Sequence, residues 1–135
     1  MATLEELKAK AVAMLDMAYV PYSHFPVGAA LECEDGAVFT GCNIENAAFT
    51  PTICAERAAF GTAVTAGHRE FAAIAVAGGK DGVLGEPFYP CGVCRQVMRE
   101  FCTLNMPVYV ADGEDGMLEL TLGDILPYSF GKEYL

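Results

Sequence analysis

Basic residues are scarce in this 135-residue chain, where 8 Lys and Arg stand against 18 Asp and Glu and give a formal net charge of −10. An acidic protein of this kind repels polyanions unless a basic stripe offsets its field, and the sequence contains no basic run. We therefore expect neither DNA nor RNA as a partner. A small, roughly neutral ligand suits this charge better.

Long apolar runs are missing too. No uninterrupted apolar stretch reaches the roughly 18 residues of a membrane span, and no segment joins a basic start to a long apolar run. We therefore expect a cytoplasmic protein that does not enter a membrane. Internal repeats and low-complexity linkers are also absent. With 53% hydrophobic and 19% charged residues, residues 1–135 are expected to form one domain.

The hydrophobic pattern predicts alternating helices and strands. A β-hairpin is expected over 27–44, because Asp35-Gly36 is a strong turn signal between two apolar runs. The other expected strands are 71–79, 106–112 and 117–122, and the expected helices are 4–18, 54–67, 91–105 and a short one within 123–130. This order predicts an α/β fold, a three-layer α/β/α sandwich on a mixed sheet of about five strands.

Cysteines supply the clearest chemical pattern. Cys91 and Cys94 form a Cys-x-x-Cys motif at the start of one predicted helix, and Cys54 stands at the start of another. Residues three apart share a helix face, and a helix N-terminus favours thiolate over thiol. Three such thiolates can hold zinc and leave a fourth position for water, as in catalytic rather than structural sites.

Other readings of the cysteines stay open at this point. A Cys-x-x-Cys motif also suits a redox pair or half of a structural zinc finger. Redox motifs of the thioredoxin type usually follow the first strand of a βαβ unit, whereas this one comes late, and no second pair of ligands completes a finger. The remaining cysteines lie in apolar runs and are expected to be buried hydrophobes, and His68 is expected to be a solvated residue at a helix end. These cysteines are Cys33, Cys42 and Cys102.

Two charged residues follow Cys54 directly. Glu56 lies about 200° from Cys54 on a regular helix, so the two side chains can serve one cavity only in the first turn. There the carboxylate can take a proton from zinc-activated water and return it elsewhere. Arg57 can donate hydrogen bonds to the thiolates and withdraw their excess negative charge. The alternatives are a Glu that merely favours the helix dipole and an exposed helix Arg.

Four motifs in order, "FPVGAA", "GCNIENA", "CAERAA" and "PCGVCRQV", resemble the small homotetrameric cytidine deaminases. The resemblance runs from "AYVPYSHFPVGAAL" to "ILPYSF", and "CAE" with "PCGVC" also matches the three-cysteine variant of the zinc nucleobase deaminases. It implies the cytidine deaminase-like fold and one Zn²⁺ per subunit, held by Cys54, Cys91 and Cys94. It also implies that Glu56 shuttles protons.

The resemblance further implies a substrate site. Asn43 and Glu45 would bind the ribose 3′-hydroxyl, Phe25 would pack against the pyrimidine, and the backbone of Ala55 would contact the base edge. Phe130 would reach the active site of a neighbouring subunit in a homotetramer.

The residues themselves support the proposed sugar-binding pair. Asn43 and Glu45 lie two apart, so their side chains point the same way in an extended segment. A Glu suits a sugar hydroxyl better than a phosphate, which it would repel. The alternative is a pair of loop residues facing solvent. Phe49 stands where many relatives carry Tyr, so any hydroxyl contact made there is lost.

Together these features predict hydrolytic deamination of cytidine and 2′-deoxycytidine to uridine and 2′-deoxyuridine, with release of ammonia, in pyrimidine salvage. Zinc-activated water would attack C4 of the base while Glu56 moves protons to N3 and to the amino group. The alternatives are a deaminase of another cytosine compound, such as blasticidin S, and a zinc-stabilised domain without catalysis. Arg57, and with it Arg95, would lie behind the metal ligands.

Overall fold

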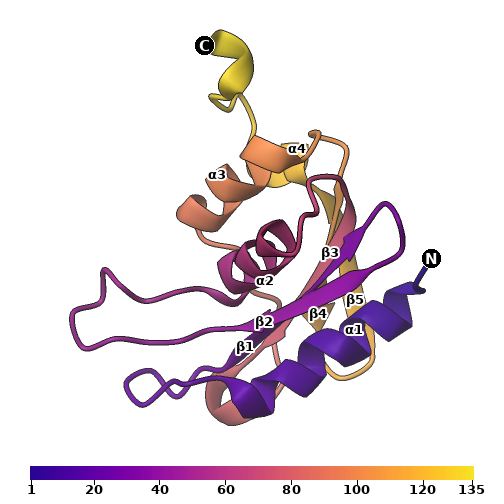
Figure 1. Ribbon diagram of the computed structural model, residues 1–135. Coiled ribbons are helices and arrows are strands. Elements are labelled where there is room, and N and C mark those ends of the chain that lie inside the picture. The colour runs from indigo at the N-terminus through magenta and orange to yellow at the C-terminus, as the bar shows by residue number, and fades with distance from the viewer.

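The computed structural model describes residues 1–135 and places a mixed five-stranded sheet between two layers of helices (Figure 1). The spatial order of the strands is β2-β1-β3-β4-β5. Only β3 and β4 run parallel, and the other neighbours are antiparallel. The strands are β1 (Val27–Cys33), β2 (Val38–Cys42), β3 (Phe71–Gly78), β4 (Pro107–Asp112) and β5 (Gly116–Thr121). The predicted α/β/α class and the predicted hairpin are confirmed.

Helix α1 (Leu4–Ala13) covers one face of the sheet, and α2 (Ala55–Thr65), α3 (Gly92–Phe101) and the short α4 (Leu122–Ile125) lie on the other (Figure 1). Short 3₁₀ turns, η1 (Met14–Met17), η2 (Lys80–Gly82) and η3 (Lys132–Tyr134), complete the elements. None of these helices combines the length and the apolar character that crossing a membrane requires.

Two predicted helices were too long. The one over 4–18 is α-helical only to Ala13 and then tightens into η1, a common ending for a helix. The one over 91–105 ends at Phe101, because Cys102 adopts an extended backbone with φ −120° and ψ 151°. In the terminal segment α4 stops at Ile125, two residues before Pro127, which cannot continue a helix.

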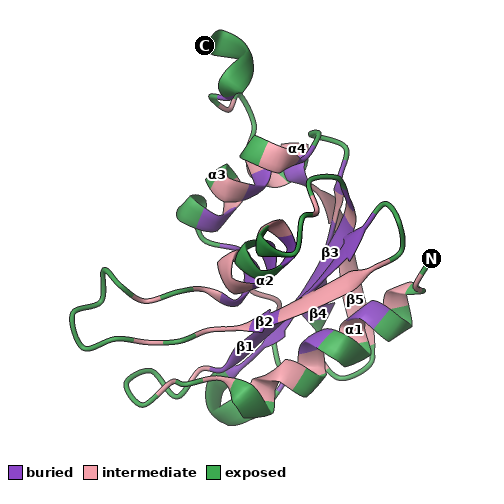
Figure 2. Ribbon diagram, viewed as in Figure 1, coloured by how far each residue is buried: buried purple, intermediate pink, exposed green.

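Alternation along β3 divides the interior into two cores. Ile74 and Val76 face α2 and α3 within a cluster of 18 buried residues, whereas Ala73, Ala75 and Ala77 face α1 within a cluster of 8. The small alanine side chains let α1 lie close to the sheet, and β1 and β3 are buried on both faces (Figure 2). Helices α2 and α3 thus rest on the larger core.

Gly41 on β2 sets the position of helix α2. A Cβ added there would lie 2.5 Å from Ala55 O and from Ala59 N, closer than non-bonded atoms approach. The first turn of α2 therefore lies directly against the backbone of β2. Helix α3 is the crossover between the parallel strands β3 and β4.

Candidate metal centre and adjoining pocket

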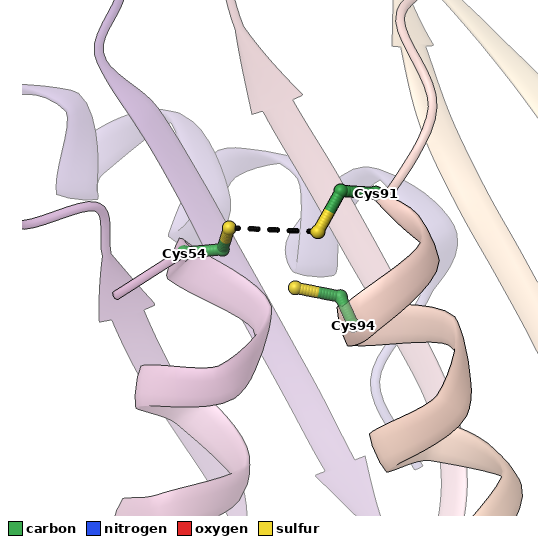
Figure 3. Close-up of side chains that lie close together, drawn as sticks. All are labelled: Cys54, Cys91 and Cys94. Atoms are coloured by element: carbon green, nitrogen blue, oxygen red, sulfur yellow. Dashed lines mark hydrogen bonds between the residues drawn. The ribbon is translucent and has the colours of Figure 1, made fainter. Parts of the chain in front are cut away.

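Three thiols converge where α2 and α3 begin. Cys54 and Cys91 are the N-cap residues of these helices, so each helix starts one residue later than predicted and the cysteine caps it. Cys94 follows in the first turn of α3, and Figure 3 shows the three sulfurs pointing toward one another. All three lie within 4.8 Å of one another, and Cys54 Sγ is 3.8 Å from Cys91 Sγ. We call Cys54, Cys91 and Cys94 the thiol trio.

The thiol trio fits zinc. Two thiolates bound tetrahedrally at a Zn–S distance of about 2.3 Å lie about 3.8 Å apart, which is the observed separation of Cys54 and Cys91. The donors are soft sulfurs, which zinc accepts readily. Both N-cap cysteines also lie at the positive ends of helix dipoles. Three protein ligands leave room for one that is not from the protein.

Charge within the thiol trio is shared unequally. A hydrogen bond with the Cys94 thiol, supported by Arg57 and Cys91, lowers the pKa of Cys54 to about 5. The same bond, together with burial, raises the pKa of Cys94. The protein alone therefore stabilises one thiolate, and binding of a cation would release the remaining protons.

Arg57 lies beside these sulfurs, as expected. Its Nη2 donates to Cys54 Sγ at 3.4 Å and to Thr52 O at 3.4 Å, and the bond to Cys54 raises the pKa of the guanidinium. Such a donor disperses thiolate charge without replacing a ligand. Arg95 behaves differently, because the hydrogen bonds of its side chain go to carbonyl groups and not to a sulfur. It donates to Pro90 O and Ile125 O, both at 2.6 Å, and so braces the loop that leads to Cys91.

Glu56 is buried next to the thiol trio. It is only 3% exposed and lines the same pocket as Cys54 and Cys91. Burial raises the pKa of its carboxyl to about 7, and the negative charge of Cys54 adds to that rise. A carboxyl that titrates near neutrality can both accept and donate a proton. The first-turn geometry expected for Glu56 is present.

A pocket of about 240 Å³ adjoins the thiol trio. Four of the expected substrate residues line it with Glu56: Phe25, Asn43, Glu45 and Ala55. The other lining residues are Val27, Thr52, Cys54, Phe88, Tyr89 and Cys91. As the first residue of α2, Ala55 has an N–H without a partner inside the helix, so that group is free to meet a ligand.

Phe130 is not brought into this pocket. It is 58% exposed on the C-terminal tail, which stands away from the rest of the fold (Figure 1). The side chain of Gln96 on α3 holds the Phe130 carbonyl through a 3.0 Å hydrogen bond. Phe49 is 76% exposed and also lies outside the pocket lining.

Asn43 and Glu45 do face the pocket, and each also holds backbone. Asn43 Oδ1 accepts from Val27 N, and its Nδ2 donates to Phe25 O, both at 2.9 Å. Glu45 Oε1 accepts from Tyr22 N at 3.0 Å and Ser23 N at 3.2 Å. Hydrogen bonds from the side chain and backbone of Ser23 and from the backbone of Tyr22 lower the pKa of Glu45. The two residues are therefore not idle polar groups facing solvent.

Sequence reasoning missed Phe88 and Tyr89. The Phe88 ring meets Phe25 edge to face, with 5.4 Å between ring centroids, so two aromatic residues form one wall of the pocket. Their position directly before Pro90 and the Cys-x-x-Cys motif was the available signal, because residues next to metal ligands often line the site.

A second cluster of side chains of the kind that bind metals lies elsewhere, and no sequence motif indicated it. Cys33, Asp35 and His68 also lie within 4.8 Å of one another, and we call them the hairpin trio. His68 Nε2 is 3.0 Å from Asp35 Oδ2, so His68 is a half-buried partner of Asp35 and not a solvated end residue. Cys33 and Cys102 are buried as expected, but Cys42 is only half-buried. All six cysteines are free.

Comparisons with known proteins agree on one family. Residues 1–110 match the family model described as the cytidine and deoxycytidylate deaminase zinc-binding region. The chain is 49% identical over 132 residues to a cytidine deaminase from Sporosarcina psychrophila, covering 98% of this chain and 94% of the relative.

Solved structures give the same result. The crystal structure of a cytidine deaminase from Burkholderia pseudomallei superposes with a TM-score of 0.88 at 44% identity, covering 96% of this chain and 100% of the other. The crystal structure of a cytidine deaminase from Mycobacterium tuberculosis superposes with a TM-score of 0.81 at 36% identity. The match covers 97% of this chain and 99% of the other.

Proposed function

The chain belongs to the cytidine and deoxycytidylate deaminase family, and on that premise we propose that it deaminates cytidine and 2′-deoxycytidine hydrolytically. The products are uridine or 2′-deoxyuridine and ammonia. One observation carries this proposal: a buried carboxyl, Glu56, shares a pocket with three convergent thiols that fit zinc.

The thiol trio would hold the zinc ion, which when bound supplies the Lewis acidity that makes water a nucleophile near neutral pH. Arg57 stays charged beside Cys54 and disperses the negative charge of the thiolates.

Glu56 is the proton carrier. Its carboxylate takes a proton from the attacking water and delivers it to N3 of the base, which makes C4 more electrophilic. It then passes the second proton to the amino group, which leaves as ammonia. A pKa of about 7, caused by burial, suits both directions of transfer. Burial in the pocket also keeps bulk water from exchanging these protons.

The rest of the pocket would orient the nucleoside. Phe25 and Phe88 offer an aromatic wall for the flat base, and the N–H of Ala55 can meet its edge. Asn43 and Glu45 supply polar groups for the ribose 3′-hydroxyl. A grip on the 3′ side tolerates deoxyribose, which is why both nucleosides are proposed.

The test combines an ultraviolet assay of cytidine loss with metal analysis of the purified protein. Glu56→Gln should keep zinc and lose about 10²–10⁴-fold in kcat. Glu32→Gln is the matched control, because Glu32 is equally buried at 3% but bonds Ala2 N, away from the pocket. Near-normal turnover by Glu56→Gln would reject the assigned role.

Substrate class is tested in the same assay. Cytidine and 2′-deoxycytidine should be turned over, whereas blasticidin S and a cytosine-containing oligonucleotide should not. Zinc content without turnover of any cytosine compound would indicate a zinc-stabilised domain and would reject the enzyme assignment.

We further infer that the chain forms a homotetramer in which Phe130 completes the pocket of a neighbouring subunit. The exposure of Phe130 on a projecting tail supports this. Sedimentation with activity measurements tests it, and a fully active monomer would contradict it. A role in pyrimidine salvage within the cytoplasm is part of the same proposal, and six free thiols suit such a reducing compartment.

A further inference from the structure

The pocket wall formed by Phe25 belongs to a segment with no helix or strand of its own. Residues 18–26, between η1 and β1, contain only turns and one isolated bridge, and His24 adopts a left-handed backbone with φ 55°. Pro26 follows Phe25 and has no N–H with which to join a ladder. The placement of the Phe25 ring therefore depends on bonds from neighbouring elements.

Asn43 supplies two of these bonds, one on each side of Pro26. Its amide accepts from Val27 N and donates to Phe25 O, so the side chain takes the place of a partner strand across the proline. The anchor itself is fixed, because Asn43 N donates to Val27 O at 3.2 Å and Asn43 O accepts from Tyr19 N at 3.0 Å.

Glu45 holds the same segment further upstream. One carboxylate oxygen, Oε1, accepts from the successive N–H groups of Tyr22 and Ser23. The Ser23 hydroxyl then accepts from Phe25 N at 3.0 Å, so this chain of bonds also ends at Phe25. Glu45 N donates to Tyr19 O at 2.9 Å, which fixes the carboxylate relative to the segment.

These bonds leave capacity for a ligand. A carboxamide has two N–H groups and two lone pairs on oxygen, and Asn43 uses one of each for the backbone. The backbone N–H groups of Tyr22 and Ser23 both bond to Glu45 Oε1, and neither bonds to Oε2. Both residues line the pocket with Phe25, so their remaining groups can reach a bound sugar.

We propose that Asn43 and Glu45, besides meeting the ribose, are positioning residues that hold Phe25 at the pocket wall. The sugar grip and the base wall are then one unit, and losing either polar side chain weakens contacts with the base as well as with the sugar. The inference rests on the proposed deamination of nucleosides.

A substrate without the 3′-hydroxyl separates the two roles. 2′,3′-Dideoxycytidine has no 3′-hydroxyl, so a residue that acts only on that hydroxyl cannot affect its turnover. We expect Asn43→Ala to lower kcat/KM for this substrate about tenfold, the cost of one neutral hydrogen bond or slightly more. Glu45→Ala should do the same, and Glu45→Gln, which keeps an acceptor oxygen for Tyr22 and Ser23, should restore most of the loss.

Asn46→Ala is the matched control. Asn46 lies in the same loop, but its side chain accepts only from Ala48 N and does not line the pocket. Phe25→Ala combined with Asn43→Ala should be no slower on the dideoxy substrate than the slower single variant. A kcat/KM in Asn43→Ala within twofold of the unmodified protein, or fully additive losses, would overturn the proposal.

A second measurement needs no activity. The sequence contains no Trp, so Phe25→Trp introduces a single Trp at the wall itself, whose fluorescence can be excited selectively over that of the tyrosines. In that background Asn43→Ala should increase acrylamide quenching, whereas Asn46→Ala should leave it unchanged. Equal quenching in Phe25→Trp alone and in its combinations with Asn43→Ala and with Asn46→Ala, all with zinc retained, would also overturn the proposal. Failure of the unmodified protein to deaminate cytidine would reject the proposed function instead, and the quenching result would still stand.

Discussion

The thiol trio and the hairpin trio each bring three groups of the kind that bind metals close together, yet the surroundings of their cysteines differ. Each set of three ligand atoms lies within 4.8 Å. In the thiol trio, two members cap helix N-termini and Arg57 donates to Cys54. In the hairpin trio, Asp35 and His68 are already partners, and His68 follows the C-terminal end of α2.

The cysteines of the two clusters show this contrast directly. The Cys94 thiol, Arg57 and Cys91 lower the pKa of Cys54 to about 5. Burial, followed by the negative charges of Asp35 and Glu32, raises the pKa of Cys33. A cysteine ligand must be ionised, so the hydrogen bonds and burial around each thiol, and not proximity alone, separate a metal centre from a cluster of polar side chains.

Removing one thiol from each cluster should give the largest difference. Cys94→Ser should reduce zinc from about one ion per chain to none and abolish deamination, because two sulfurs do not hold a catalytic site. Cys33→Ser should keep zinc and deamination, at a cost of about 1–3 kcal/mol in the free energy of unfolding from burying a hydroxyl. Metal analysis and thermal melts measure these outcomes. Loss of zinc in Cys33→Ser alone would reverse the assignment.

In chelator-treated protein, Cys54 should react with iodoacetamide faster than Cys33 by about two orders of magnitude or more, since only the thiolate reacts. Cys54, with a pKa of about 5, is ionised at neutral pH, and its alkylation should slow only as pH falls through that value. Cys33 has a raised pKa and is fully buried, so it should stay unmodified. Peptide mapping at several pH values identifies the modified cysteine, and faster labelling of Cys33 would contradict this contrast.

Neutralising the guanidinium beside the thiol trio should have an intermediate effect. Arg57→Gln should weaken zinc binding about 10–100-fold, the usual cost of losing a partner behind a metal ligand. Arg69→Gln is the control near the hairpin trio, because Arg69 donates only to the carbonyls of Val64 and His68. Competition with a chromophoric chelator measures the zinc affinity of both variants. Equal zinc affinities in Arg57→Gln and Arg69→Gln would show that Arg57 does not support the metal.

Breaking the pair in the hairpin trio should have the smallest effect. The N–H of Ala37 and the His68 side chain lower the pKa of Asp35, so its charge stabilises the fold at neutral pH. That contribution is lost as pH falls through the lowered pKa. Asp35→Asn should therefore melt slightly below the unmodified protein near neutrality and level with it in strong acid. A difference in melting temperature between the two proteins that widens on acidification would contradict a stabilising charge on Asp35.

Much of the fold could be predicted from local pattern. Asp35-Gly36 marked the hairpin, and the apolar run 71–79 marked a buried strand, because turn chemistry and side-chain alternation act over a few residues. Helix ends were predicted less well. Ala13 and Phe101 end their helices earlier than periodicity indicated, because packing and the direction of the following segment decide where a helix stops.

For the site, the sequence named the residue types and tertiary structure assigned their contacts. Two short motifs supplied Cys54, Glu56 and the Cys-x-x-Cys pair, since the chemistry of a zinc–water site demands thiolates and a nearby carboxylate. Nothing local could show that Asn43 bonds the backbone around Pro26, or that Phe88 meets Phe25. Those contacts join residues far apart in the chain.

By itself, then, the sequence determined the elements, the two helix-start motifs and the donors available for a metal, because these depend on neighbours along the chain. The motifs already indicated Cys54, Cys91 and Cys94 as the ligands, and only the tertiary structure brought their sulfurs within 4.8 Å of one another. The order of strands, and the close approach that Gly41 permits, bring the starts of α2 and α3 together. Hydrogen bonds from Cys94, Arg57 and Cys91 then lower the pKa of Cys54, whereas burial raises the pKa of Cys33.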